Sequence, residues 1–422
     1  MTAQHEQQTE GVIAEYTSIF RHQWNPITAG ILLSLFNILL FAYAKPWNAA
    51  EGFLNWGKWM MKGVGVDMGE EPSIFMMTTS VTNLSLIAGA AISAMLSREF
   101  FLQVPSGREM ARGLFGAVLM GIGAILGLGC TVGGFLSAYS ALSLGGVLMM
   151  FGLAIGAYLG LKLLLWDLQN EAPQVDLPHK ASIQTIWKII QSRVSSRGPT
   201  WNPLRELWFN IQPYVGMALA LLVTALLIWD STEFTASGIT GRRSVLVFFG
   251  LLLGVVNQRS RFCFVRAFRE PFMTGEASMT KGAAVAMLVG VVGFAVIKGS
   301  DLADFRNEME VVNPTVWFGS LVGGIVFGIG MVLAGGCGTG SLWRAGEGQV
   351  KLWAVCIVFA LSAVTTFRVV NAIGLRTLVG DKAVYIPHLM GWAGGLIFLL
   401  VLPVAWYLVA AWNERTGKFV IA

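Results

Sequence analysis

Long apolar runs separated by short polar segments make up most of this chain. An α-helix of about 20 apolar residues is long enough to cross the hydrocarbon core of a bilayer. The run at 244–256 is shorter, so we expect a half-helix or a re-entrant segment there. The pattern predicts an all-α polytopic membrane protein of about ten spans, including short or re-entrant helices. The predicted spans are 27–45, 73–96, 112–129, 145–166, 213–230, 244–256, 281–298, 315–333, 351–370 and 389–412.

The composition agrees with a membrane protein. Of the 422 residues, 55% are hydrophobic and only 13% are charged. A soluble domain is about 25% charged, so a water-soluble enzyme is excluded. The net charge of +5 does not indicate a nucleic-acid partner, because the basic residues lie between the apolar runs and form no single basic face. The expected surroundings are a lipid bilayer.

The polar segment 167–212 divides the chain into two similar parts. It contains several prolines and charges of both signs, and it carries five basic residues. Basic loops favour the cytoplasmic side, so we expect a cytoplasmic linker here. The first membrane half is then 27–166 and the second is 213–412.

The same rule orients the rest of the chain. The arginines of the segments 98–112 and 259–269 fall on the side of the linker if each predicted span crosses once. The tails 1–26 and 413–422 are then cytoplasmic as well. No small-residue cleavage site follows the first apolar run, so no cleaved signal peptide is expected. We predict a multi-pass protein of the cell inner membrane with both termini in the cytoplasm.

The two halves resemble each other around a Gly-Cys pair. A shift of 207 residues places GAVLMGIGAILGLGCTVGGF over GGIVFGIGMVLAGGCGTGSL and aligns Cys130 with Cys337. Five predicted spans separate the two cysteines, and an odd number makes the motifs enter the membrane from opposite faces. This predicts an inverted-topology repeat, which is typical of transporters. Close packing of helices through glycine is the alternative explanation, but packing alone does not require a cysteine at both places.

Each Gly-Cys motif combines groups that suit an anion containing sulfur. Glycine-rich turns interrupt a helix and expose backbone N–H groups, which attract anions. Hydroxyl groups add donors, and a thiol is a weak donor with a soft, polarisable sulfur. The candidate binding residues are Gly129, Cys130, Thr131, Gly336, Cys337 and Thr339.

A third motif, NQRSRFCFVR, follows the short run 244–256. Arginine binds oxyanions well, so Arg261 and Cys263 are candidates for the mouth of a pore. The alternative is a cluster that only marks the cytoplasmic side, and for Arg344 an anion contact and an interfacial anchor both stay open. The first half has no cysteine that corresponds to Cys263. Cys356 lies inside an apolar run and is expected to be a packing residue.

Other chemistries lack their residues. The cysteines form no CxxC pair and the four histidines lie in polar or terminal stretches, so we expect no metal and no cofactor. The chain contains no GxxxxGK[ST] motif for ATP. We predict no catalytic residues and no enzymatic activity. A membrane sulfurtransferase or thiol redox protein is the alternative, in which a cysteine would react covalently.

The segments GLGCTVGG, QRSRFCFVRAFRE and LAGGCGTGSLWRAGEGQ resemble the YeeE/YedE family of sulfur-transport membrane proteins, and the second half is most similar to the YedE branch. The resemblance implies two inverted halves, an hourglass shape with two dents, and thiosulfate import past a line of cysteines. It implies Cys130 and Cys337 as relay thiols and Cys263 in the cytoplasm-facing dent. It also implies a small sulfurtransferase-like protein as a partner.

The chain departs from the family pattern at two points. Gly134 and Ser341 stand where a histidine can follow the motif, and the second motif is GCGTG. We expect uptake of a small sulfur-containing anion, with thiosulfate first, by non-covalent contacts along the thiols. A selenium compound is the alternative substrate, in keeping with the selenium-related role suggested for the YedE branch.

Overall fold

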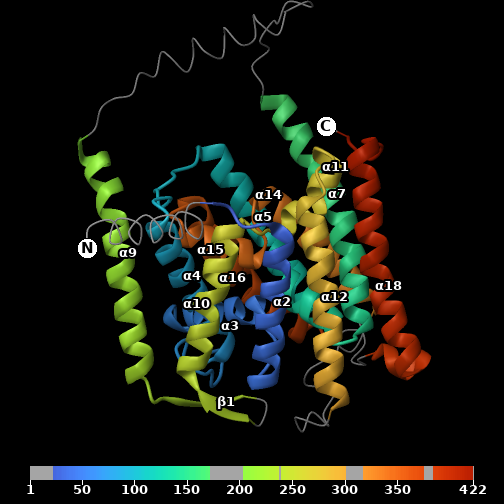
Figure 1. Ribbon diagram of the computed structural model, residues 1–422, viewed down its shortest axis with the longest axis horizontal. Helices are drawn as coiled ribbons and strands as arrows, with labels where there is room; N and C mark the ends of the chain where they lie inside the picture. The colour runs from blue at the N-terminus through green and yellow to red at the C-terminus, as the bar shows by residue number, and fades with distance from the viewer. Residues whose placement is uncertain (1–21, 172–202, 237–238, 301–316, 375–383, 422) are drawn as a thin grey trace, which may run out of the picture.

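The computed structural model describes residues 22–171, 203–236, 239–300, 317–374 and 384–421, and it is almost entirely helical (Figure 1). Ten helical segments of this part are long and apolar enough to cross a membrane. The predicted all-α polytopic class is therefore confirmed. The longer helices are α2 (Pro26–Tyr43), α4 (Thr78–Leu96), α5 (Gly107–Leu126), α7 (Leu144–Glu171), α9 (Pro203–Trp229), α10 (Arg243–Ser260), α12 (Ser278–Gly299), α14 (Trp317–Ala334), α16 (Val350–Ala372) and α18 (Ile386–Thr416).

Shorter elements lie between these helices. Helix α3 (Ala49–Gly63) is amphipathic, because Glu51, Lys58 and Lys62 interrupt its apolar residues. The other short elements are η1 (Thr131–Ser137), α6 (Ala138–Ser140), α11 (Phe264–Met273) and α15 (Gly338–Gly346). A hairpin of β1 (Glu233–Ala236) and β2 (Ile239–Arg242), which the hydropathy pattern did not predict, joins α9 to α10.

Several helices are longer than the predicted spans. Helix α10 has 18 residues, so the short run 244–256 is not a half-helix. Polar residues extend it, and they find partners within the protein: Gln258 accepts a hydrogen bond from Ser93 (2.7 Å) and donates one to Glu99 (2.7 Å). Helices α7 and α9 reach into both ends of the predicted linker 167–212, and its middle lies outside the described residues.

Glycines bring the central helices into backbone contact. A Cβ built on Gly116 of α5 would lie 2.5 Å from the Gly330 carbonyl oxygen of α14, and one on Gly123 would lie 2.7 Å from that of Gly323. Gly116 meets Gly330, whereas Gly123, which comes later in α5, meets Gly323, which comes earlier in α14. The two helices are therefore antiparallel. The glycines shared by the repeat inside α5 and α14 therefore serve close helix packing.

Neighbouring helices occur in matching pairs. Helix α2 of the first half packs on α12 of the second half, and in the same way α10 of the second half packs on α4 of the first. Helix α7 packs on α14, and in the same way α16 packs on α5. Helix α9 packs on α4 as α18 packs on α12, and these two stand at opposite sides of the molecule (Figure 1). The first and second halves of the chain are thus interleaved and share one interior.

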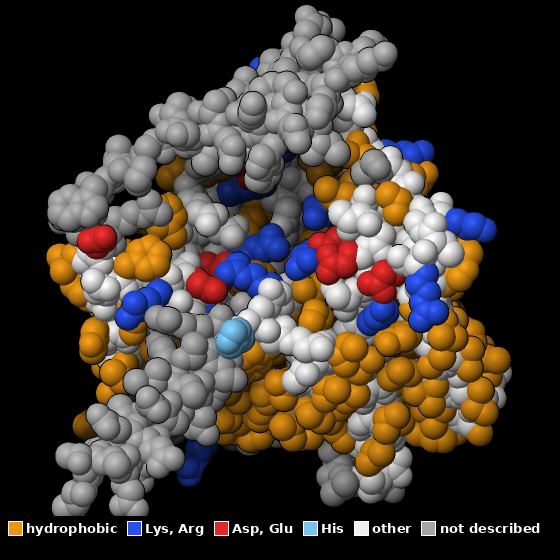
Figure 2. Space-filling model, turned by 45° about the horizontal axis from the view of Figure 1, so that its top comes forward, with side chains coloured by type: hydrophobic (Ala, Val, Ile, Leu, Met, Phe, Trp, Pro, Cys, Tyr) orange, Lys and Arg blue, Asp and Glu red, His pale blue; other side chains and the backbone are white. Residues whose placement is uncertain are grey.

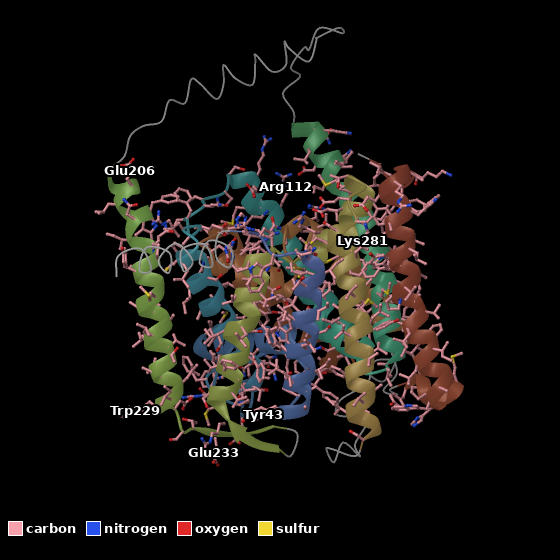
Figure 3. All side chains as sticks on the ribbon, in the orientation of Figure 1. Tyr43, Arg112, Glu206, Trp229, Glu233 and Lys281 are labelled. Carbon is pink, nitrogen blue, oxygen red and sulfur yellow. The ribbon has the colours of Figure 1, made fainter. Side chains whose placement is uncertain are left out.

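Charged side chains gather at the upper end of the helix bundle (Figure 2). Arg112, Glu206 and Lys281 are at the upper end in Figure 3, and Tyr43, Trp229 and Glu233 are at the lower end. With the upper end turned forward, charged side chains gather across its middle and a broad hydrophobic flank lies below them (Figure 2). The predicted basic segments around Arg112 and the start of α9 therefore share one end.

Candidate functional site

Each of the three candidate cysteines stands directly before a short helix. Cys130 precedes η1 and its Sγ accepts a hydrogen bond from the backbone N–H of Val132 (3.5 Å). Cys337 precedes α15 and accepts one from Gly340 (3.3 Å). Cys263 precedes α11. The first N–H groups of a helix lack intrahelical partners and carry the positive end of its dipole, so each thiol lies where an anion is stabilised.

The three thiols converge although they come from distant parts of the sequence. A Cβ built on Gly338 would lie 3.4 Å from Cys130 Sγ. One built on Gly340, in the same turn, would lie 3.3 Å from Cys337 Sγ and 3.5 Å from Cys263 Sγ. The thiols of Cys263 and Cys337 face each other, and all three cysteines are buried. The structure therefore places the predicted thiols around one turn of α15, where only glycine leaves the space beside the sulfurs open.

Asn48 is a site residue that the sequence analysis missed. It precedes α3, and the Cys130 thiol faces the backbone amide of Ala50 at the start of the same helix. Gly133 corresponds to Gly340 in the repeat, and a Cβ built on it would lie 2.1 Å from Asn48 Oδ1. Asn48 thus occupies in the first half the place that Cys263 occupies in the second. A helix N-cap preference for asparagine was the available signal, but the helix itself was not predicted.

Buried hydroxyl groups surround the thiols. The Oγ1 atoms of Thr131 and Thr339 and the Oγ atom of Ser341 have no hydrogen-bond partner within the described residues, and neither does Asn48 Oδ1. Thr131 lies close to Cys337 without forming a well-aligned hydrogen bond. An unpaired buried polar atom is costly, so such a cluster fits a site that pairs these atoms with a substrate.

The two candidate glycines next to the cysteines differ in how strictly the turns need them. A Cβ built on Gly129 would lie 2.2 Å from the backbone nitrogen of Gly134. One built on Gly336 would lie 2.9 Å from Ser341 Oγ. Gly129 is therefore needed for the chain to fold back before η1, whereas a side chain at 336 would displace only the Ser341 hydroxyl.

Arg261 lies at the end of α10 and is engaged by two carboxylates. Its Nη2 atom is 3.1 Å from Glu99 Oε2, and its Nη1 atom is 3.3 Å from Glu347. The buried Arg259 shares Glu99 at 3.1 Å. Burial raises the pKa of the Glu347 carboxyl. The positive charge of Arg261 is therefore largely balanced by its neighbours, which sequence spacing alone did not indicate.

Arg344 and Arg269 are less balanced than Arg261. Arg344 donates a hydrogen bond to the Gly335 carbonyl (2.6 Å) and stacks 5.0 Å from the ring centre of the buried Trp343. Among the described residues it forms no ion pair. The buried Nε of Arg269 also has no hydrogen-bond partner there. Both arginines interact electrostatically with Cys263, and Arg269 interacts with Glu270 as well, so this thiol has two cationic neighbours.

Cys356 lies within α16, where it is 8% exposed and packs in the hydrophobic core. This is the packing role that the sequence analysis expected for it.

Comparison with known proteins agrees with these features. The sequence model of the family described as Sulphur transport matches residues 2–159 and 259–420. The chain is 25% identical to the "Probable transporter YedE" of Escherichia coli over 411 residues, which is 93% of each protein. It is 38% identical to the "Thiosulfate transporter TsuA" of Escherichia coli over 129 residues, covering 30% of this chain and 34% of that protein. The TsuA of Spirochaeta thermophila is 34% identical over 117 residues, with 28% and 34% covered.

Proposed function

This chain belongs to the sulphur transport family, and we propose that it takes up a small sulfur-containing anion, thiosulfate first, along Cys130, Cys337 and Cys263. The observation that carries the proposal is the convergence of these three buried thiols around the Gly338–Gly340 turn. Similarity to proteins named thiosulfate transporters supports the choice of substrate.

The chemistry of the site fits an anion with an exposed sulfur. Backbone N–H groups at the starts of η1, α11 and α15 face the thiols and are suited to hold oxyanion oxygens. Thr131, Thr339 and Ser341 supply further donors. The soft thiols meet the substrate sulfur through weak S–H···S contacts. Weak contacts at several sites let an ion enter and leave, whereas one tight site would hold it.

The membrane arrangement that we propose is an inverted repeat in the cell inner membrane. The antiparallel packing of α5 on α14 and the matching helix pairs support it. The end that carries Arg112 and the start of α9 is then cytoplasmic, because basic residues favour that side. The described C-terminal residues lie at the same end (Figure 1).

The positive groups near Cys263 form the cytoplasmic mouth in this proposal. Arg261 and Arg344 lie 6.0 Å and 5.0 Å from the ring centre of Trp343, so they flank one indole. We assign anion steering to both, with the larger share to Arg344 because carboxylates balance Arg261. A small sulfurtransferase-like protein would receive the anion at this end.

Two alternatives use the same thiols. A selenium compound would be a soft ligand like the substrate sulfur, so it stays a candidate. A membrane sulfurtransferase or thiol redox protein is the second, because the thiols of Cys263 and Cys337 face each other. That protein would form a persulfide or disulfide during turnover.

Uptake assays separate these functions. Cells or proteoliposomes that contain the chain are given labelled thiosulfate, sulfite, sulfate or selenite. The proposal predicts saturable uptake of thiosulfate above sulfate, with no sulfur added to the protein in intact-mass spectra. Faster uptake of selenite than thiosulfate would favour the selenium alternative. A stable sulfur adduct during turnover would favour the enzyme.

A further inference from the structure

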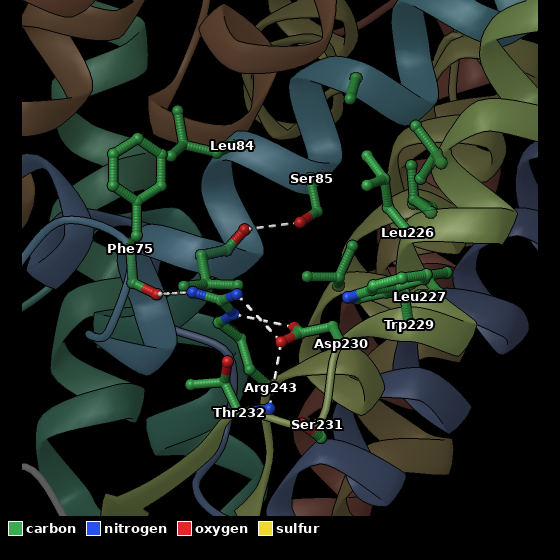
Figure 4. Close-up of a pocket in the computed structure, with 15 residues that line it drawn as sticks. Phe75, Leu84, Ser85, Leu226, Leu227, Trp229, Asp230, Ser231, Thr232 and Arg243 are labelled. Carbon is green, nitrogen blue, oxygen red and sulfur yellow. Dashed lines mark hydrogen bonds and ion pairs between the residues drawn. The ribbon is translucent and has the colours of Figure 1, made fainter.

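A cleft of ≈ 650 Å³ lies between α4, α9 and α10, outside the group of thiols (Figure 4). Its walls are formed mainly by apolar residues, among them Val81, Leu84 and Ala88 of α4 and Val223 and Leu227 of α9. This volume is within the range of small-ligand sites, which is about 300–1,000 Å³. The cleft is therefore large enough for an elongated apolar group.

The position of the cleft identifies the medium that fills it. All three helices are membrane-spanning segments, and α9 turns much of its surface outward, with Leu222 and Leu226 both more than half exposed. The cleft is continuous with this lipid-facing surface, because Leu226 belongs to both. An empty apolar cavity loses the dispersion contacts of its lining. Lipid acyl chains are the apolar groups that a bilayer supplies at this depth.

One end of the cleft is polar. Arg243 Nε donates to Asp230 Oδ2 (2.9 Å) and Arg243 Nη2 donates to Asp230 Oδ1 (3.0 Å). Ser231 and Thr232 lie beside this pair, and the largely exposed Trp229 marks the membrane interface. Arg243 Nη1 donates to the Phe75 carbonyl (3.3 Å), so the charge of Arg243 is balanced and its guanidinium is held in place. Such a pair of opposite charges suits a zwitterionic headgroup, with the phosphate near the guanidinium and the amine near the carboxylate.

We propose that this cleft is a phospholipid site, in which one acyl chain lies between α9 and α4 and the headgroup contacts the Arg243–Asp230 pair. The lipid completes the attachment of α9, whose other end is held by the hydrogen bond from Gln212 to the Phe100 carbonyl (2.8 Å). The site is separate from the proposed transport path, so its test does not depend on the transported anion.

Native mass spectrometry of the full chain in a mild detergent tests the proposal. After reconstitution with phosphatidylethanolamine, the unchanged protein should retain one phospholipid. Ala88→Trp fills the cleft with an indole and should lower the bound fraction about tenfold. Leu222→Trp adds the same indole to the outward face of α9 and should retain the lipid. Val223→Trp is the second filling variant if Ala88→Trp does not fold.

Two results would overturn the proposal. One is an unchanged protein that carries no phospholipid after reconstitution. The other is equal lipid retention by the filling variant and by the Leu222→Trp control, because the bound lipid would then lie elsewhere.

Discussion

A methyl group added at Gly340 would test the space between the thiols. Gly340 is the third residue of α15 and its φ is negative, so alanine needs no unusual backbone conformation there. The added Cβ would lie 3.5 Å from Cys263 Sγ, which is ordinary contact, and 3.3 Å from Cys337 Sγ, so the Cys337 thiol must move by a few tenths of an ångström. Gly340→Ala should still fold, because the helix propensity of alanine, worth up to about 1 kcal/mol, offsets the cost of this small movement.

The effect on uptake follows from the same distances. The methyl group occupies the side on which a substrate sulfur would approach both thiols. Two weak contacts of about 0.5–1.5 kcal/mol each are then lost. Together they correspond to a fall of roughly 5- to 150-fold in the uptake rate at low thiosulfate concentration.

The assay is the initial rate of labelled thiosulfate uptake into proteoliposomes, with protein amount and thermal midpoint measured on the same samples. Gly394→Ala is the matched control, because a Cβ there meets only Met390 Cβ at 3.4 Å on the outer helix α18. It should leave uptake unchanged. Normal uptake by Gly340→Ala, with the added methyl group tolerated, would refute the proposed path.

Three further predictions concern topology, steering and the ion pair at the lipid cleft. Impermeant thiol reagents should reach cysteines introduced at Arg108 and at Phe318 from opposite faces, because both positions are exposed near the starts of the antiparallel helices α5 and α14; access to both from one face would contradict the inverted repeat. Arg344→Gln should slow uptake more at low salt than at high salt, because ions screen steering, whereas a rate insensitive to salt would assign this arginine to packing. The neighbouring arginine lowers the pKa of Asp230 to about 2, so the pair stabilises the fold above the usual aspartate value and loses that effect as the pH falls towards 2. The thermal midpoint should therefore fall less for Asp230→Asn than for the unchanged protein between about pH 4 and pH 2, and equal falls would contradict this assignment.

Hydropathy was sufficient for the membrane class, because ten segments in the described part of the chain are apolar over the length that a bilayer requires. It was insufficient for the short elements. Helix α3 carries Glu51, Lys58 and Lys62, so its mean hydropathy does not stand out from a loop. The polar end of α10 looked like the end of a span, but Glu99 and Ser93 from α4 and its following turn satisfy its side chains.

The candidate site was partly predictable for a similar reason. The Gly-Cys repeat identified Cys130 and Cys337, because both motifs break a helix in the same way. Convergence with Cys263 and the role of Asn48 depend on contacts between distant segments, which spacing does not encode. The engagement of Arg261 by Glu99 and Glu347 is likewise a tertiary contact. The transport roles of these residues stay predictions.

The most direct test of the thiol path compares Cys337→Ser with Cys356→Ser in labelled thiosulfate uptake. Both changes replace one buried sulfur by a hydroxyl group, but only Cys337 faces another candidate thiol and the Gly340 turn. The account predicts a large fall in the initial rate for Cys337→Ser, with Cys356→Ser close to the unchanged protein when equal amounts are inserted. Equal rates for the two variants would contradict the claim that the substrate sulfur passes Cys337.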